Sequence, residues 1–79
     1  MTEEEWTAKA TKSLVGKKIV HVEYMSEENC KEFYWDSRPL AIHFDDGTYI
    51  VPMRDDEGND GGAMATNIAG FETIPVLWV

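Results

Sequence analysis

The chain has 79 residues, enough for one small domain and too few for a second hydrophobic core. Its 15 Asp and Glu residues exceed its 7 Lys and Arg residues, so the formal net charge is −8 at pH 7. A field of this sign repels nucleic-acid phosphates and anionic membranes, which argues against both as partners. We therefore expect a single domain over residues 1–79, and we expect a charged partner to be basic.

The single cysteine, Cys30, allows no internal disulfide bond. Acidic residues surround it and would raise the pKa of its thiol, so we expect no redox role. The first residues lack the apolar stretch of a signal peptide, and no apolar run reaches membrane-spanning length. These features predict a cytoplasmic protein.

The N-terminal residues predict a helix over about residues 3–14. Thr2 suits the N-cap, and Glu5 suits the return position of a capping box. Apolar residues then recur at helical spacing from Trp6 to Leu14. We expect Trp6 to anchor this helix to the rest of the domain.

The remaining chain predicts strands over about residues 18–25, 32–35, 39–45, 48–53 and 71–78. The strongest local signal is a hairpin that joins the third and fourth of these, because Asp46-Gly47 is a preferred pair for a two-residue turn. One helix followed by short strands indicates a mainly β fold. We predict a small antiparallel roll or SH3-like barrel of about five strands.

The most distinctive segment is the acidic, glycine-rich loop over residues 54–62, called the acidic loop below. Its oxygen-bearing side chains could hold a divalent cation such as calcium, and the candidate ligands are Asp55, Asp56, Glu57, Asn59 and Asp60. The EF-hand pattern fails in both registers, because Asp60 takes the glycine position in one and Gly58 a ligand position in the other. In the alternatives, these side chains bond the backbone of the loop itself, or its carboxylates hold Arg38 or Arg54.

The two histidines, His21 and His43, are both expected on strand faces that point away from the core. If their strands pair, they share a face with Glu23 and Asp45. Such a cluster could bind a transition metal or act as an acid–base pair, whereas separate surface histidines are the simpler interpretation.

The sequence offers no nucleophile or acid–base motif of a familiar kind, and GxSxG is absent. We therefore predict a non-enzymatic binding or accessory module without catalytic residues or a cofactor, which engages a protein partner through the acidic loop. The candidate partner-binding residues are Tyr34, Trp35, Arg38, Asp55, Asp56 and Glu57. An exposed aromatic residue beside an arginine has the composition of a binding hot spot. Two alternatives stay open: a divalent-cation-binding domain, and an immunity- or antitoxin-like acidic inhibitor of a basic partner.

The C-terminal residues Ile74 to Val79 are mostly apolar and strand-like. A strand of this kind left unpaired is prone to associate with another edge. We expect it to pair within its own sheet or to form a homodimer through this segment.

The central stretch also carries a resemblance. Asp45-Asp46-Gly47-Thr48, followed by Asp55-Asp56-Glu57-Gly58-Asn59, resembles short uncharacterised bacterial proteins with a DDGT hairpin and a DDEGN-type acidic loop. The resemblance implies a bacterial cytoplasmic origin and no particular activity.

Overall fold

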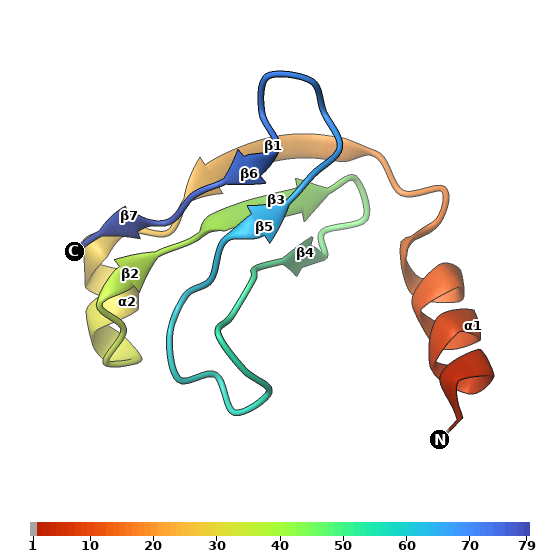
Figure 1. The fold of residues 1–79 in the computed structure, drawn as a ribbon, viewed down its shortest axis with the longest axis horizontal. Helices are drawn as coiled ribbons and strands as arrows, with labels where there is room; N and C mark the ends of the chain where they lie inside the picture. The colour runs from red at the N-terminus through yellow and green to blue at the C-terminus, as the bar shows by residue number, and fades with distance from the viewer. Residues whose placement is uncertain (1) are drawn as a thin grey trace.

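The computed structural model describes residues 2–79 (Figure 1). Its elements in chain order are α1 (Glu3–Leu14), β1 (Ile19–Tyr24), α2 (Glu27–Glu32), β2 (Ser37–Arg38), β3 (Leu40–Phe44), β4 (Tyr49–Ile50), β5 (Met64–Ala65), β6 (Thr73–Ile74) and β7 (Leu77–Trp78). The strands form one three-stranded sheet, β1-β3-β4, and two two-stranded sheets, β2-β7 and β5-β6, all antiparallel. The fold is therefore mainly β behind an N-terminal helix, as predicted. Over the described residues these sheets do not close into a barrel.

Helix α1 occupies the residues that the sequence predicts for it. Thr2 Oγ1 accepts a hydrogen bond from the Glu5 amide at 3.2 Å, and Glu5 Oε1 accepts one from the Thr2 amide at 3.3 Å. This capping box satisfies two of the amides that a helix start leaves free. The helix nevertheless buries none of its residues, and Trp6 is 57% exposed. The expectation that Trp6 anchors α1 is therefore wrong, and Figure 1 shows the helix standing apart from the sheets.

The β3–β4 hairpin forms as predicted, but its loop has three residues instead of two. The Gly47 amide donates to Phe44 O at 3.2 Å, and the Phe44 amide donates to Thr48 O at 2.9 Å. Gly47 has φ +87°, a left-handed conformation that glycine adopts without a Cβ clash. A type I turn followed by such a residue is the common three-residue hairpin connection.

One basic residue after α1 reaches this hairpin turn. Lys17 Nζ lies 3.0 Å from Asp46 Oδ2, and the Thr48 hydroxyl donates to Asp46 Oδ1 at 2.6 Å. The hydrogen bonds from Thr48, and then the contact with Lys17, lower the pKa of Asp46 to about 2. The basic N-terminal part and the acidic central part of the chain thus meet at this turn.

Residues 32–35 do not form the predicted strand. The Ser26 hydroxyl instead accepts a hydrogen bond from the Asn29 amide at 3.1 Å and caps α2, whose first turn is acidic. This capping outweighs the strand preference of the aromatic residues that follow. Those residues therefore lie at the end of a helix and do not alternate across a sheet.

The predicted strand over residues 48–53 is shorter in the structure. β4 ends before Pro52, which has no amide hydrogen to give to a sheet. Met53 then makes an isolated antiparallel bridge with Gly61, which closes the base of the acidic loop. A Cβ on Gly61 would run into the Pro39 ring, so glycine permits this close approach.

The predicted strand over residues 71–78 is two strands that join different partners. β6 pairs with β5, and β7 pairs with β2, with Pro75 between them. The C-terminal segment thus pairs within its own chain, one of the two arrangements that the sequence predicts.

The buried core is small and lies where α2, β2 and β3 meet. Its members are Cys30, Trp35, Ser37, Pro39, Ala41, Phe44 and Gly61. Many large apolar side chains elsewhere remain exposed, among them three of the six residues of β1. Within residues 2–79, neither helix has the length and apolar composition needed to cross a membrane.

Candidate binding groove

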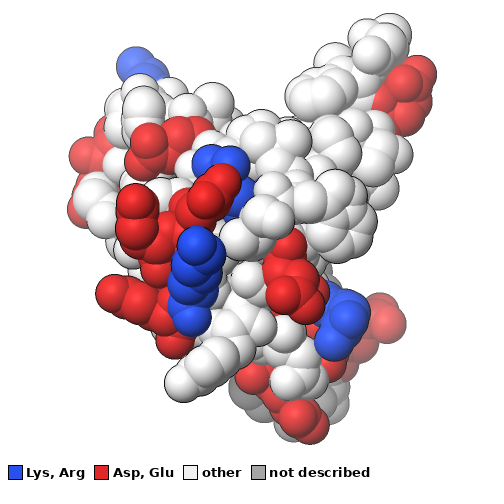
Figure 2. Space-filling model, turned by 90° about the vertical axis from the view of Figure 1, so that its left-hand side faces the viewer, with Lys and Arg blue, Asp and Glu red and all other residues white. Residues whose placement is uncertain are grey.

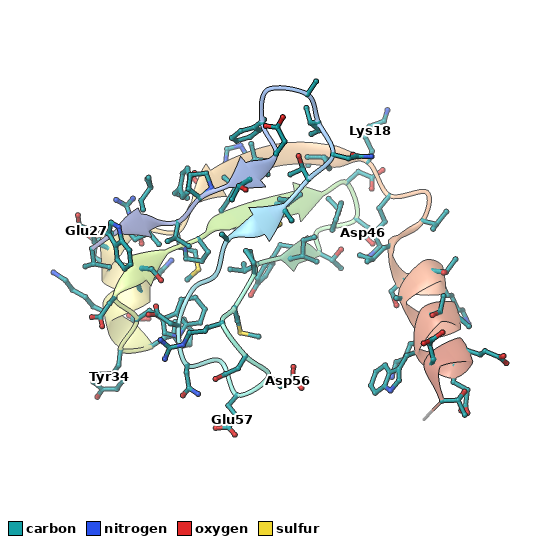
Figure 3. The ribbon with its side chains drawn as sticks, viewed as in Figure 1. Lys18, Glu27, Tyr34, Asp46, Asp56 and Glu57 are labelled. Carbon is teal, nitrogen blue, oxygen red and sulfur yellow. The ribbon has the colours of Figure 1, made fainter. Side chains whose placement is uncertain are left out.

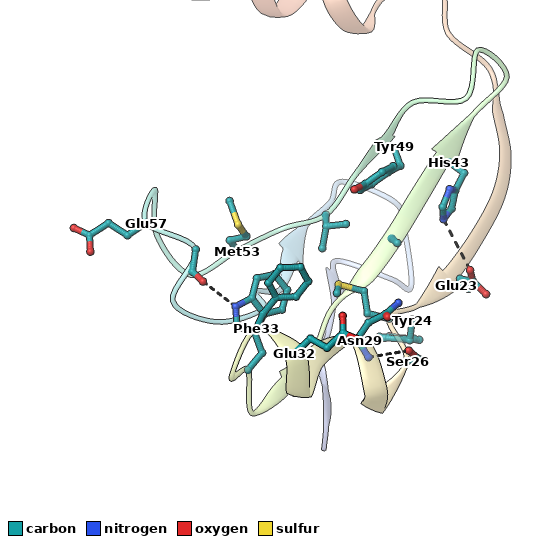
Figure 4. A pocket seen from close by; sticks show the side chains of 15 residues that line it. Glu23, Tyr24, Ser26, Asn29, Glu32, Phe33, His43, Tyr49, Met53 and Glu57 are labelled. Carbon is teal, nitrogen blue, oxygen red and sulfur yellow. Dashed lines mark hydrogen bonds and ion pairs between the residues drawn. The ribbon is translucent and has the colours of Figure 1, made fainter.

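A groove of about 800 Å³ opens between α2, the outer face of the β1-β3-β4 sheet and the acidic loop (Figure 4). Its lining residues are Glu23, Tyr24, Met25, Ser26, Asn29, Glu32, Phe33, Trp35, Ala41, His43, Tyr49, Val51, Met53, Glu57 and Gly58. Sheet pairing explains this composition, because β1 and β3 place Glu23 opposite Ala41, and β3 and β4 place His43 opposite Tyr49. Side chains at these alternate positions point to one face of the sheet.

Trp35 fixes the acidic loop to the floor of the groove. Its side chain is buried, and its Nε1 donates to Gly58 O at 2.8 Å. The Phe33 ring lies beside it, with ring centroids 5.5 Å apart. Phe33 is 58% exposed, so it presents an aromatic surface to the open space of the groove.

Tyr34 sits at a strained backbone position next to the groove. The Tyr34 amide donates to Lys31 O at 3.1 Å, and the Trp35 amide donates to Cys30 O at 2.9 Å. This pair of bonds is the Schellman arrangement that ends a helix, and it requires a left-handed residue that is usually glycine. Tyr34 has φ 60° and is 92% exposed, and its side chain projects from the end of α2 in Figure 3.

Asp60 ties the acidic loop to β2. Its Oδ1 accepts hydrogen bonds from the Ser37 hydroxyl at 2.7 Å, the Gly61 amide at 2.8 Å and the Ser37 amide at 3.1 Å. These bonds, chiefly the one from the Ser37 hydroxyl, lower the pKa of Asp60. The carboxylate is therefore a structural acceptor within the fold.

Asp55 organises the tip of the same loop. Its Oδ2 accepts from Asn59 Nδ2 at 2.7 Å, and its Oδ1 accepts from the amides of Glu57 and Asn59 at 3.1 and 3.3 Å. The bonds from Asn59 are the main cause of the lowered pKa of Asp55. Asp56 and Glu57 project outward from the loop in Figure 3.

The bonds of Asp55 to the Glu57 and Asn59 amides match the prediction that side chains of the acidic loop bond its backbone, whereas the Asn59 side chain bonds Asp55 and Asp60 accepts chiefly from Ser37. Both carboxylate oxygens of Asp55 and Oδ1 of Asp60 accept hydrogen bonds from the protein, and the two sets of bonds share no donor. Among residues 2–79, no three His, Cys, Asp or Glu side chains are placed so that they could hold a metal ion. The geometry of the five candidate ligands therefore lends no support to a cation site.

The contacts of Arg38 and Arg54 differ from the expectation that carboxylates of the acidic loop hold one of these two side chains. Arg38 Nε donates to Met25 O at 2.8 Å, and its Nη1 lies 4.0 Å from Glu27 Oε1. Arg54 meets the loop through its backbone, where its amide donates to Asp60 O at 2.9 Å.

The two histidines do come together on one face of the sheet, where His43 is part of the groove lining and His21 is not. Their strands pair in a register that sets His21 opposite His43, with ring centroids 5.6 Å apart. Glu23 lies 3.4 Å from His21 Nε2 and 4.0 Å from His43 Nε2. Asp45, the fourth expected member, instead faces Lys18, whose amide donates to Asp45 Oδ1 at 3.3 Å. The cluster therefore has two histidines and one carboxylate, all accessible to solvent.

The Asp, Glu, Lys and Arg side chains that line the groove within residues 2–79 are all acidic. Three glutamates, Glu23, Glu32 and Glu57, are part of its lining, and over residues 2–79 the lining contains no Lys or Arg. Figure 2 shows acidic side chains spread over the α2 end of the molecule, with only a few basic ones among them. Cys30 lies beneath this surface, and burial raises the pKa of its thiol, which keeps it protonated.

Of the six predicted partner-binding residues, two line the groove, Trp35 and Glu57. Tyr34 is exposed beside it, and the other three, Arg38, Asp55 and Asp56, are not part of the lining. The sequence prediction missed the aromatic residues Phe33 and Tyr49. Tyr49 could have been found from strand alternation, which puts it on the same face as Val51 and Met53.

Comparison of the chain with protein-family models, with curated proteins and with solved structures finds no significant match. The groove and its chemistry are therefore the basis for a functional assignment.

Proposed function

We propose that this protein is a non-enzymatic binding module that holds a basic, apolar peptide segment of a protein partner in the groove. The observation that carries the proposal is the composition of the lining: aromatic and methionine side chains beside three glutamates, with no Lys or Arg among the described residues. Aromatic side chains supply large contact areas at interfaces, and carboxylates favour lysine or arginine on the partner.

The position of the acidic side chains supports recognition by charge at the border and by apolar contact at the centre. Glu57 extends from the acidic loop on one side of Phe33, and Glu32 lies on α2 at the other (Figure 4). A basic residue that flanks an apolar one in an extended peptide would meet a carboxylate while the apolar side chain contacts the Phe33 ring.

The exposed tyrosine strengthens this assignment. The end of α2 requires a left-handed residue, and glycine would fill that position without strain, yet Tyr34 occupies it with its side chain almost wholly in solvent. A strained residue of this kind is a pointer to function. The place of Tyr34 next to Phe33 makes it a natural extension of the aromatic surface toward a partner.

Fluorescence anisotropy with a labelled short peptide of alternating lysine and phenylalanine tests the proposal. Phe33→Ala should weaken binding by about tenfold or more, the loss of a central aromatic contact. Glu32→Gln should weaken it by about twofold to fivefold, the size of an exposed ion pair, and more at low salt than at high salt.

Glu4→Gln on α1 is the matched control, because it removes the same charge at an exposed site outside the groove lining. The proposal fails if Glu4→Gln weakens binding as much as Glu32→Gln does. It also fails if a peptide with glutamate in place of lysine binds equally well.

A further inference from the structure

Within residues 2–79, strand β1 is an edge of the three-stranded sheet and pairs only with β3. The Met25 amide donates to Pro39 O at 3.0 Å, which continues the β1–β3 register beyond Tyr24. In an antiparallel pair, residues that exchange hydrogen bonds alternate with residues whose amides point away. Val22 and Tyr24 therefore direct their backbone N–H and C=O groups to the open edge.

The same edge is apolar and exposed. Ile19 is 57% exposed, Val20 58% and Val22 49%, so most of the strand has no covering side chains. A strand with exposed apolar side chains and free backbone groups is a template for another strand.

We propose that the occupant of this edge is β1 of a second copy, paired antiparallel about a two-fold axis at Val22. In this register Val22 faces Val22, and the outward backbone groups of Val22 in each copy meet those of the other. The two facing Val22 residues exchange both of their backbone hydrogen bonds, and none are counted at Val20, because the β1–β3 register shifts between Ile19 and His21.

Charge complementarity selects the antiparallel register. His21 of each copy falls opposite Glu23 of the other, a favourable cross-strand pair. Beyond the strand ends, the basic flank of Lys17 and Lys18 approaches the acidic flank that begins at Glu27. Figure 3 shows Lys18 and Glu27 at opposite ends of the β1 region, as this requires.

Neighbouring arrangements are less favourable. A parallel pairing would bring Lys18 against Lys18. An antiparallel pairing shifted by two residues toward the C-terminus would set Glu23 against Glu23, and like charges directly opposite are destabilising. The sequence of β1 thus favours the register centred on Val22.

The dimer joins the two sheets into one continuous sheet of strand order β4-β3-β1-β1-β3-β4. A two-fold axis perpendicular to the sheet keeps both grooves on the same face. Two grooves on one face would bind a partner with two basic segments more tightly than either groove alone.

Sedimentation velocity over concentrations up to the order of 100 µM tests the dimer directly, because a two-fold assembly is concentration-dependent. We expect twice the monomer mass for the native chain and for Val22→Thr, which keeps the amide and the β-branch. Val22→Pro should sediment as a monomer. It removes an amide that points to the open edge and is not needed by the β1–β3 pair.

Val22→Lys provides a second variant if circular dichroism shows that Val22→Pro is unfolded, because it would put two ammonium groups opposite each other. Hydrogen exchange adds a position-specific readout: the Val22 amide should gain protection as concentration rises, whereas Glu23 stays protected throughout. A native chain that is monomeric at every concentration overturns the proposal. A dimer that persists in Val22→Lys, or that leaves the Val22 amide unprotected, also overturns it.

Discussion

Replacing Tyr34 by glycine should make this protein more stable. Tyr34 occupies the left-handed position of the Schellman motif that ends α2, with φ 60°. The left-handed conformation costs a residue with a Cβ about 1–2 kcal/mol. Glycine avoids this cost but loses about 0.5–1 kcal/mol through the greater freedom of its unfolded chain. Because Tyr34 is 92% exposed, removing its side chain sacrifices little packing.

The net expectation for Tyr34→Gly is a gain of about 0.5–1 kcal/mol in the free energy of unfolding. In a domain of this size, that gain raises the melting temperature by about 2–8 °C. Urea denaturation and calorimetry measure both quantities. Tyr34→Ala is the matched control, since it removes the same side chain yet keeps the Cβ, and it should leave stability near that of the native chain.

A Tyr34→Gly variant that is no more stable than Tyr34→Ala would show that the left-handed backbone of Tyr34 stores no strain. If both variants also bind the lysine–phenylalanine peptide more weakly, the strained tyrosine is retained for contact with a partner. Stability and binding would then move in opposite directions at one residue, as expected where strain is kept for function.

Three further results are expected. Folding lowers the pKa values of Asp46 and Asp60 from the unfolded value of 3.8, to about 2 for Asp46. Each carboxylate therefore stabilises the fold above pH 3.8, and this stabilisation is lost as the pH falls through the pKa of the folded state. Urea denaturation from pH 7 to pH 2 should show that the free energy of unfolding falls below about pH 4, and this fall should be smaller in Asp60→Asn. Trp35→Phe removes the hydrogen bond to Gly58, so it should lower the free energy of unfolding by about 1 kcal/mol and speed amide exchange in the acidic loop. Trp78 is 75% exposed, so the control Trp78→Phe should change neither quantity. Millimolar calcium should leave the melting temperature within about 1 °C of its metal-free value, and a rise of several degrees would contradict the loop geometry described above.

Local signals in the sequence predict the parts of this fold that depend on local chemistry. The Thr2 and Glu5 capping box sets the start of α1, and Asp46-Gly47 marks the hairpin turn. Alternation in β1 and β3 brings His21 and His43 to one face, as their spacing suggests.

The errors arise where tertiary contacts or backbone strain decide the outcome. The aromatic run at Phe33 to Trp35 favours a strand by propensity, but the Ser26 cap and a left-handed Tyr34 make it a helix end. Sequence patterns give no sign of a left-handed tyrosine, because glycine or asparagine is usual there.

The groove itself was only partly predictable. Its lining is drawn from α2, three strands and the acidic loop, and these segments meet only through long-range contacts. The bond from Trp35 to Gly58 joins two such segments, and no spacing in the sequence indicates it. Asp60 likewise acts as a hydrogen-bond acceptor within the fold because of Ser37, which lies on a strand too short to recognise by periodicity.

A titration of ¹⁵N-labelled protein with the lysine–phenylalanine peptide, followed by NMR, tests the central claim most directly. If the groove holds the peptide, the Trp35 indole signal and the amide signals of Phe33, Tyr49 and Gly58 shift together and saturate, while those of α1 stay in place. No saturating shift is expected with the glutamate–phenylalanine peptide. Shifts confined to α1 or scattered over the whole chain, or an equal response to both peptides, would contradict a binding groove at this site.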